Sequence, residues 1–118
     1  MDIPAIQHRL QHFADERDWQ QFHSPKNLAI ALSVEAAELL EHFQWLTEAQ
    51  SRDIDADSHT MQAVREEMAD VMIYLLRLAD VLGVDLEQAV GEKMQRNAEK
   101  YPLALARGNA TKYNRRNV

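Results

Sequence analysis

Apolar residues recur at helical spacing along the first half of the chain. Over about residues 4–18 they fall three or four positions apart, which predicts a first helix. An irregular connection with two aromatic residues is expected over 18–23. Ser24 followed by Pro25 is then a typical helix start, with serine as the N-cap and proline in the first turn. No helix breaker follows, so a second helix is predicted over about 26–46.

The second half of the chain shows two more helical patterns after a polar break. Residues 47–58 are polar and acid-rich, and we expect a loop there. A third helix is predicted over about 59–82, ended by Gly83, because apolar residues form one stripe: Val64, Met68, Val71, Leu75, Leu78 and Leu82. Asp85, with a glutamine three residues on, resembles a capping box that starts a fourth helix over about 86–100.

These patterns predict an all-α protein with a four-helix, bundle-like fold. Glycine and proline occur only three times each, which favours helix over strand and turn. A chain of 118 residues with 46% hydrophobic content fits one domain, which we expect over residues 1–102. Residues 103–118 carry four basic residues and no acid, and we expect them to form a basic C-terminal tail.

The composition excludes several classes of protein. No cysteine is present, so disulfide scaffolds, thiolate nucleophiles and iron–sulfur clusters are excluded. No apolar run approaches the roughly 20 residues that span a bilayer, and the N-terminus lacks a signal-peptide pattern. We therefore expect a soluble, cytoplasmic protein without a membrane partner. The net charge of −6 argues against a nucleic-acid partner, because Lys and Arg dominate the binding of nucleic-acid phosphates.

Four carboxylates occupy positions where surface acids are not expected. On a helical wheel, Glu35 and Glu38 fall within the apolar arc of the second helix, which spans roughly 120°. Glu67 and Asp70 flank the apolar stripe of the third helix. Each pair is spaced i, i+3, so its two carboxylates lie on one face of a helix. Crowded like charges resist removal from water, and a hard divalent cation such as Mg²⁺ or Mn²⁺ is their natural counter-charge.

Two other interpretations of these acids stay open. They could be ordinary surface charges, since an E-x-x-E pair recurs by chance in helical proteins. A ferritin-like di-iron site would instead need Glu-x-x-His pairs, and none of the five histidines lies three residues after a glutamate. The oxygen-only set therefore favours magnesium chemistry over oxygen activation.

A second group of polar residues lies on the predicted fourth helix. Lys93 and Asn97 share one face, and Tyr101 lies one further turn along. A lysine near a carboxylate–metal cluster could bind phosphate oxygens, and an asparagine has both donors and acceptors for the edge of a base. The simpler interpretation is that Lys93 and Asn97 are solvated polar residues of the helix.

Other aromatic residues and histidines carry less information. Aromatic side chains are more often core or interface residues than stacking platforms, and on sequence grounds this holds for Trp19, Phe22, Trp45 and Tyr74. His12 and His23 have no recognisable partner in the sequence, so no role is assigned to them.

Three segments of the chain resemble the MazG-like all-α nucleotide pyrophosphohydrolases, and within that family the dCTP pyrophosphatase branch. The segments are ERDWQQFHSPKNLAIALSVEAAELLEHFQW (16–45), EEMADVMIYLLRLAD (66–80) and EKMQRNAEKYP (92–102). The similarity covers most of residues 10–113. It is specific, because the E-x-x-E and E-x-x-D pairs occur with their flanking FQW, VMIYL and K-x-x-x-N-x-x-x-Y contexts.

The resemblance implies Mg²⁺-dependent hydrolysis of a nucleoside triphosphate, dCTP or a modified dCTP, to the monophosphate and pyrophosphate. The implied metal ligands are Glu35, Glu38, Glu67 and Asp70. The implied nucleotide contacts are Lys93, Asn97 and Tyr101, with aromatic positions around base and sugar at Trp19, Trp45 and Tyr74. The resemblance also implies a homodimer or homotetramer in which the pocket forms at a subunit interface.

For the catalytic roles we expect Glu38 to orient the attacking water and Lys93 to offset charge on the phosphates. Two alternatives remain open. One is a non-catalytic helical interaction module whose acidic stripe pairs with a basic partner, although a docking stripe should lie on an exposed face. The other is a related enzyme that acts on dUTP or phosphoribosyl-ATP. The chain departs from relatives at Ser33-Val34, where a glycine is common, and over the loop 47–61.

Overall fold

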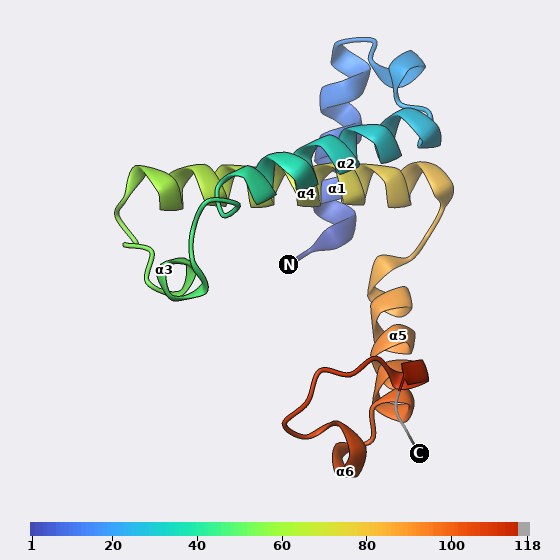
Figure 1. The fold of residues 1–118 in the computed structure, drawn as a ribbon. Helices are drawn as coiled ribbons and strands as arrows, with labels where there is room; N and C mark the ends of the chain where they lie inside the picture. The colour runs from blue at the N-terminus through green and yellow to red at the C-terminus, as the bar shows by residue number, and fades with distance from the viewer. Residues whose placement is uncertain (116–118) are drawn as a thin grey trace. The chain divides into compact units, whose positions relative to one another are not determined.

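The described part of the chain is helical. A computed structural model describes residues 1–115 and contains no strand in that range, so the predicted all-α class is confirmed. None of the helices within this range is long and apolar enough to cross a membrane. The elements are α1 (Ile3–Glu16), η1 (Gln20–Phe22), α2 (Pro25–Glu41), α3 (Glu48–Arg52), α4 (His59–Leu82), α5 (Leu86–Lys100), α6 (Leu103–Ala106) and η2 (Tyr113–Arg115). They form two compact units, Met1–Val84 and a second that begins at Asp85, and each is described by itself (Figure 1).

Side-chain caps set the helix ends that the sequence predicts. The Ser24 hydroxyl oxygen accepts a hydrogen bond at 3.1 Å from the backbone N–H three residues on, and Pro25 opens α2. Gly83 follows α4 with a φ of 71°, a left-handed conformation that glycine adopts without strain. Asp85 caps α5 by accepting from the N–H of Gln88 at 3.1 Å. These boundaries depend on local chemistry, so the sequence alone predicts them.

Two predicted boundaries are wrong. Residues 47–58 contain the short helix α3, because Thr47 and Gln50 form a capping box in which each side chain bonds to the other residue's backbone. The second helix ends at Glu41, several residues before the predicted end near 46, and hydrogen-bonded turns follow it. Apolar residues continue at helical spacing past this point, so the periodicity overestimates the length of the helix.

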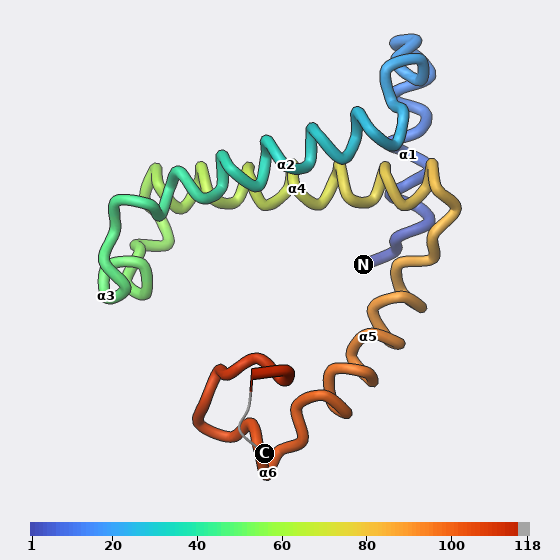
Figure 2. The backbone as a smooth tube through the Cα atoms, turned by 45° about the vertical axis from the view of Figure 1, so that its right-hand side comes forward, coloured from blue at the N-terminus to red at the C-terminus, as the bar shows by residue number. Residues whose placement is uncertain are grey.

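The first unit is built on an antiparallel pair of long helices. α2 and α4 lie side by side along their length, and α1 crosses α4 (Figures 1 and 2). Gln7 donates a hydrogen bond from α1 to the backbone oxygen of Leu76 on α4 at 3.0 Å. The buried side chains of the described residues are Ala14, Leu28, Val64, Leu76, Ala79 and the charged Arg77. Complete burial of a leucine stabilises a fold by about 1.5–3 kcal/mol, so Leu28 and Leu76 anchor this small core.

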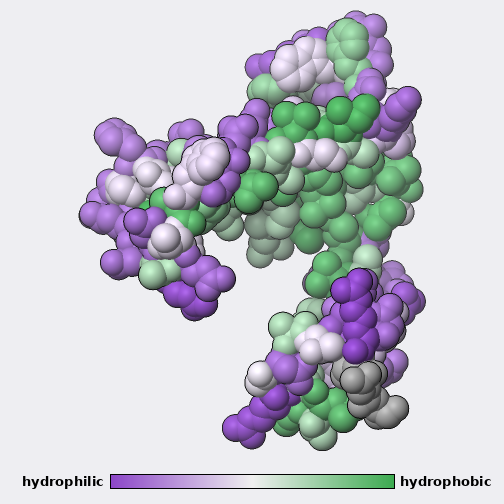
Figure 3. Space-filling view, viewed as in Figure 1, coloured by the Kyte–Doolittle hydropathy of each residue, from purple (hydrophilic) through white to green (hydrophobic). Residues whose placement is uncertain are grey.

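The apolar stripe predicted for α4 is buried only in part. Val64 is buried, but Met68 is 57% exposed. Met68, Val71 and Leu75 line an open groove of about 590 Å³, which Leu39 of α2 also lines. Figure 3 shows apolar surface gathered over α2 and α4. Periodicity identifies the apolar residues, but a helix that packs against one long partner buries only one strip of them.

In the second unit, the chain after α6 returns to the end of α5. The rings of Tyr101 and Tyr113 meet edge to face with centroids 6.1 Å apart, and the N–H of Tyr113 donates to Tyr101 Oη at 3.4 Å. Lys100 Nζ lies 4.7 Å from the centroid of the Tyr113 ring, which is a cation–π contact. The described part of the predicted basic tail therefore contacts α5. Residues 116–118 lie outside the described residues, and a domain boundary at 102 stays a prediction.

Candidate functional site

Three carboxylates meet where α2 packs against α4. Glu35 and Glu38 come from α2 and Glu67 from α4, and one carboxylate oxygen of each lies within 4.8 Å of the others. All three residues are partly buried. The i, i+3 spacing puts the first two on one face of α2, and the packing of the helices supplies the third. The structure thus brings together three of the four predicted metal ligands.

The described residues compensate the charge of these carboxylates poorly. Glu35 Oε2 and Glu67 Oε2 are buried and have no hydrogen-bond partner within residues 1–115. Burial, and after it the neighbouring Glu67 and Glu38 carboxylates, raise the pKa of Glu35 from 4.5 to about 7. A buried polar atom without a partner costs about 1–3 kcal/mol. The cluster therefore favours the uptake of a proton or a cation.

The set of donor atoms fits a hard divalent cation. All the donors are carboxylate oxygens, and oxygen ligands suit Mg²⁺ or Mn²⁺ better than softer metals. Such an ion would satisfy the two buried oxygens that lack a partner in the described part of the chain. Asp70 lies one turn after Glu67 on α4 and is partly buried, but it is outside the group of three. Its role as a fourth ligand stays a prediction.

A small pocket adjoins Asp70. It has a volume of about 150 Å³, and its lining comes from α1, α4 and the α1–α2 connection: Leu10, Phe13, Trp19, His23, Asp70, Ile73, Tyr74 and Arg77. Two predicted aromatic positions, Trp19 and Tyr74, thus share one pocket. Phe13 and Trp19 meet edge to face with ring centroids 5.7 Å apart. An engineered cavity of about 150 Å³ in another protein binds benzene, so the pocket matches one six-membered ring.

One face of α4 joins the carboxylates to the ring-sized pocket. Glu67, Asp70, Tyr74 and Arg77 follow one another at intervals of three, four and three residues, so they lie along one side of the helix. From Glu67 to Arg77 this face extends for about 15 Å along the helix axis. A single helix therefore carries a carboxylate of the acidic cluster near one end of this face and lining residues of the ring-sized pocket along the rest of it.

The remaining predicted site residues belong to other parts of the chain. Trp45 lies beyond the C-terminal end of α2 and is 87% exposed. Lys93 and Asn97 belong to α5, and Tyr101 follows it, so these three are part of the second unit. Lys93 is exposed, and the nearby charge of Lys100 lowers its pKa. α5 as a whole carries no net charge, because its three basic residues are matched by Glu87, Glu92 and Glu99.

Sequence reasoning missed several residues of the pocket. His23, to which the sequence assigns no partner, accepts a hydrogen bond from Arg77, which lies 54 positions away. No local pattern reports a contact between residues so far apart. Arg77 does continue the polar face of α4 that begins at Glu67, and this spacing is the one sequence signal that points to it.

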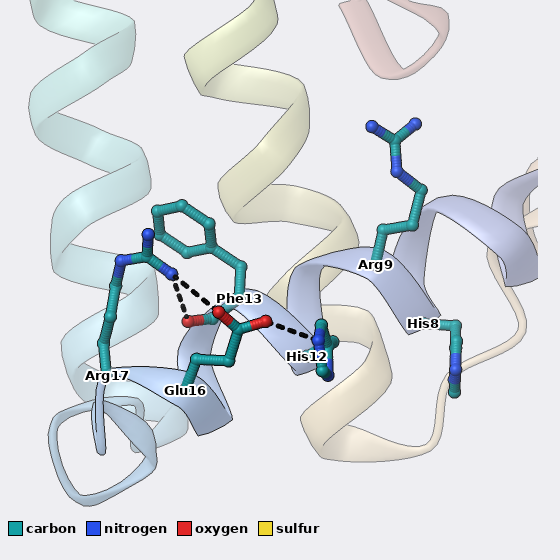
Figure 4. A pocket seen from close by; sticks show the side chains of 6 residues that line it. All are labelled: His8, Arg9, His12, Phe13, Glu16 and Arg17. Atoms are coloured by element: carbon teal, nitrogen blue, oxygen red, sulfur yellow. Dashed lines mark hydrogen bonds and ion pairs between the residues drawn. The ribbon is translucent and has the colours of Figure 1, made fainter.

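His12 also has a partner, on the outer face of α1 (Figure 4). Its Nε2 contacts the carboxylate of Glu16, which also lies 4.0 Å from the Arg17 guanidinium. That guanidinium lies 3.6 Å from the centroid of the Phe13 ring. These residues, with His8 and Arg9, line an open hollow of about 430 Å³. Glu16 contacts both His12 and Arg17, so these side chains already have partners and do not indicate a ligand.

Comparison with known proteins relates this chain to one family. The sequence profile of the MazG-like family matches residues 30–115. The chain is 48% identical over 101 residues to dCTP pyrophosphatase 1 of Rattus norvegicus and 46% identical over 101 residues to that of Homo sapiens. Each match covers 86% of this chain but 59% of the relative, so the chain spans less than two thirds of these curated relatives. A crystal structure of a pyrophosphatase from Archaeoglobus fulgidus matches with a TM-score of 0.79 and 41% identity, over 86% of this chain and 94% of that chain.

The raised pKa of Glu35 predicts how the stability of the metal-free protein depends on pH. The folded state holds the Glu35 proton more tightly than the unfolded chain does. This residue therefore stabilises the fold fully below about pH 4.5, and the stabilisation is lost as the pH rises through about 7. The free energy of unfolding of the wild type, relative to Glu35→Gln, should fall over this range in urea titrations with a chelator present. Glu41→Gln, an exposed change on the same helix, should show no such trend, and parallel curves for wild type and Glu35→Gln would contradict the prediction.

Proposed function

The chain belongs to the MazG-like family, and from that premise we propose that it is a Mg²⁺-dependent nucleotide pyrophosphohydrolase. The proposed substrate is a (deoxy)nucleoside triphosphate, dCTP or a modified dCTP, and the products are the monophosphate and pyrophosphate. One observation carries the proposal: three carboxylates converge, and the buried oxygens Glu35 Oε2 and Glu67 Oε2 lack a partner within residues 1–115. The two relatives named dCTP pyrophosphatase 1 support dCTP as the substrate.

The pocket beside Asp70 supports a pyrimidine nucleotide. Its volume of about 150 Å³ fits one six-membered ring, whereas a purine adds a second, fused ring. Trp19 and Tyr74 offer aromatic surface to that ring. In the proposal, Asn97 and Tyr101 of the second unit and the exposed Trp45 complete the contacts with base and sugar.

The proposed mechanism assigns roles to the acidic residues of α2 and α4. The metal ligands are Glu35, Glu38, Glu67 and Asp70. Bound Mg²⁺ supplies charge neutralisation at the phosphate oxygens. Glu38 orients the attacking water and accepts its proton. The water oxygen forms a new bond to the phosphorus on one side of the bridge between the α- and β-phosphates, the bridge breaks, and the monophosphate and pyrophosphate separate. Lys93 offsets negative charge on the phosphates.

We also propose that the chain works as a homodimer or homotetramer with a four-helix, bundle-like core. Large apolar side chains are poorly covered within the chain, and Trp45, Leu40 and Ile30 are 87%, 60% and 53% exposed. The groove of about 590 Å³ that Met68 lines is almost wholly apolar, and apolar patches of this kind mark association sites. The proposed partners are a nucleotide and further copies of the chain, in the cytoplasm, with no nucleic acid and no membrane.

The proposed reaction is tested by loss of a carboxylate. Glu38→Gln should lower Mg²⁺-dependent pyrophosphate release from dCTP by about 100-fold or more, because it removes both a metal ligand and the water-orienting group. Asp70→Asn should cause a comparable loss if Asp70 is the fourth ligand. Helical circular dichroism should stay near that of the wild type in both variants. Glu41→Gln removes an exposed acid of the same helix and should keep wild-type activity.

A panel of canonical and modified (d)NTPs, scored for pyrophosphate and for phosphate, identifies the reaction. Pyrophosphate with a preference for dCTP is the expected result. Phosphate as the product would rule out a pyrophosphohydrolase. Inertness toward every nucleotide with Mg²⁺ or Mn²⁺, together with tight binding to a basic protein, would instead favour the interaction module.

The proposed assembly is tested by a charge placed in the apolar groove. Met68→Glu should shift the oligomer toward monomer in sedimentation analysis, because a second copy would have to bury the new carboxylate. The monomer should keep its helical signal, since Met68 is 57% exposed within one chain. Gln11→Glu adds the same charge on the exposed surface of α1 and should leave the sedimentation coefficient unchanged. A wild type that sediments as a monomer would contradict the assembly.

A further inference from the structure

In the second unit, hydrogen bonds hold the segment that follows α6 in a turn. Gly108 has a φ of 79°, a left-handed conformation that glycine adopts without strain because it has no Cβ. The Asn109 amide donates to the backbone oxygen of Leu105 at 2.9 Å, and Asn109 Oδ1 accepts from the N–H of Thr111 at 3.1 Å. We call residues 107–113 the strap, because this turn carries the chain back to the end of α5 (Figure 1).

The strap ends on the residue that follows α5. The N–H of Tyr113 donates to Tyr101 Oη at 3.4 Å, and the two rings meet edge to face. The Tyr113 ring also lies 4.7 Å from Lys100 Nζ, so it contacts two successive residues at the end of the helix. One contact acts on the ring of Tyr101 and the other on its hydroxyl. Together they restrict the rotation of a side chain that would otherwise sample several rotamers.

The bond from Tyr113 leaves Tyr101 able to donate. A backbone N–H has no lone pair to offer, so it occupies a lone pair of Tyr101 Oη and not the hydroxyl proton. A hydroxyl that accepts one hydrogen bond is polarised and donates a stronger one. Tyr101 is 37% exposed and Tyr113 is 39% exposed, so part of this pair is accessible to a ligand.

The pair lies at the end of the α5 face that carries the proposed nucleotide contacts. Lys93, Asn97 and Tyr101 follow one another at intervals of four residues, which places them along one side of the helix. The nearby charge of Lys100 has the largest effect on the pKa of Lys93, which it lowers, and Tyr101 acts on that pKa in the opposite direction. The strap therefore contacts the same end of α5 from which these residues act on Lys93.

We infer that the strap takes part in nucleotide binding: Tyr113 is a positioning residue that fixes the Tyr101 hydroxyl, from which Tyr101 donates to a base or sugar acceptor of the nucleotide. The inference rests on the proposed function and deepens it, because it gives part of the predicted basic tail a role in substrate binding. A side chain that is fixed beforehand loses less conformational entropy when the ligand binds, so it binds more tightly than a mobile one.

Two substitutions of Tyr113 test the positioning role. Tyr113→Ala removes the ring that restricts Tyr101 and should weaken the binding of dCMP in calorimetry by about tenfold. Tyr113→Phe keeps the ring and the backbone N–H, so its affinity should stay within about twofold of the wild type. With dCTP, the loss in Tyr113→Ala should appear in KM more than in kcat. Asn114→Ala, at the next exposed position, is the control and should leave dCMP binding unchanged.

A double-variant cycle shows whether Tyr113 acts through Tyr101. Tyr101→Phe removes the donating hydroxyl and should also weaken dCMP binding. Addition of Tyr113→Ala to Tyr101→Phe should then cause no further loss, because the group that Tyr113 positions is already absent. Losses that multiply would contradict the positioning role.

A spectroscopic readout follows the position of Tyr101 without any ligand. The chain has three tyrosines, so ¹³C-labelled tyrosine gives a simple spectrum in which Tyr101→Phe identifies the Tyr101 ring. Its signals should shift in Tyr113→Ala and stay in place in Tyr113→Phe. Unchanged signals in Tyr113→Ala would overturn the inference.

The outcomes separate this inference from the proposed function. Wild-type binding of dCMP by Tyr113→Ala would overturn the inference even where pyrophosphate is released. A wild type that releases no pyrophosphate but binds dCMP in a Tyr113-dependent way would overturn the proposed function and leave the inference standing. A wild type that binds no dCMP would overturn the inference.

Discussion

The packing of α2 against α4 takes the carboxylates of Glu35 and Glu67 out of water without giving either of them a hydrogen-bond donor from residues 1–115. Leu28 of α2 and Leu76 of α4 are buried in the same unit, so the gain from apolar burial and the cost of desolvated charge arise within one small core. The raised pKa of Glu35 reflects that cost, because burial and the neighbouring carboxylates disfavour its charged form. A proton relieves it in part and a divalent cation relieves it more fully, because a cation can satisfy all three carboxylates at once.

The core of this unit is small, so apolar burial provides little free energy to offset the cost of the desolvated carboxylates. Few side chains of the described residues are fully buried, while apolar residues such as Met68 remain on the surface of α4. Association with a second copy would bury that surface and add apolar contacts next to the carboxylates. Metal binding and assembly are therefore expected to support each other, since both stabilise the α2–α4 pair.

The sequence predicts the features that depend on local chemistry. The caps at Ser24 and Asp85 and the stop at Gly83 each involve neighbouring residues, and they are found as predicted. The convergence of Glu35, Glu38 and Glu67 was predictable because two i, i+3 patterns interrupt apolar faces. The contact of His23 with Arg77 was not predictable, because it depends on where the α1–α2 connection packs against α4.

The prediction that the apolar stripe of α4 forms part of the core was only partly right, for a related reason. Apolar spacing marks Met68 and Val64 alike, but Val64 is buried and Met68 is 57% exposed. The hydrophobic pattern of a sequence indicates which residues avoid water, but it does not indicate which other helix or chain covers them. The same limit applies to Trp45, whose exposure has no explanation within one chain.

The polar face of α4 connects chemistry with recognition through one rigid element. Glu67 and Asp70 lie at one end of this face, and Tyr74 and Arg77 continue it past the ring-sized pocket. Because backbone hydrogen bonds fix their relative positions, a ring held at Tyr74 has a set distance to the carboxylates. Under the proposed function, binding energy from the base would orient the phosphates, which lowers the entropic cost of reaching the reactive geometry. On the same proposal, a base of the wrong size would displace the phosphates along this face, so the geometry of α4 would couple selection of the base to the rate of the reaction.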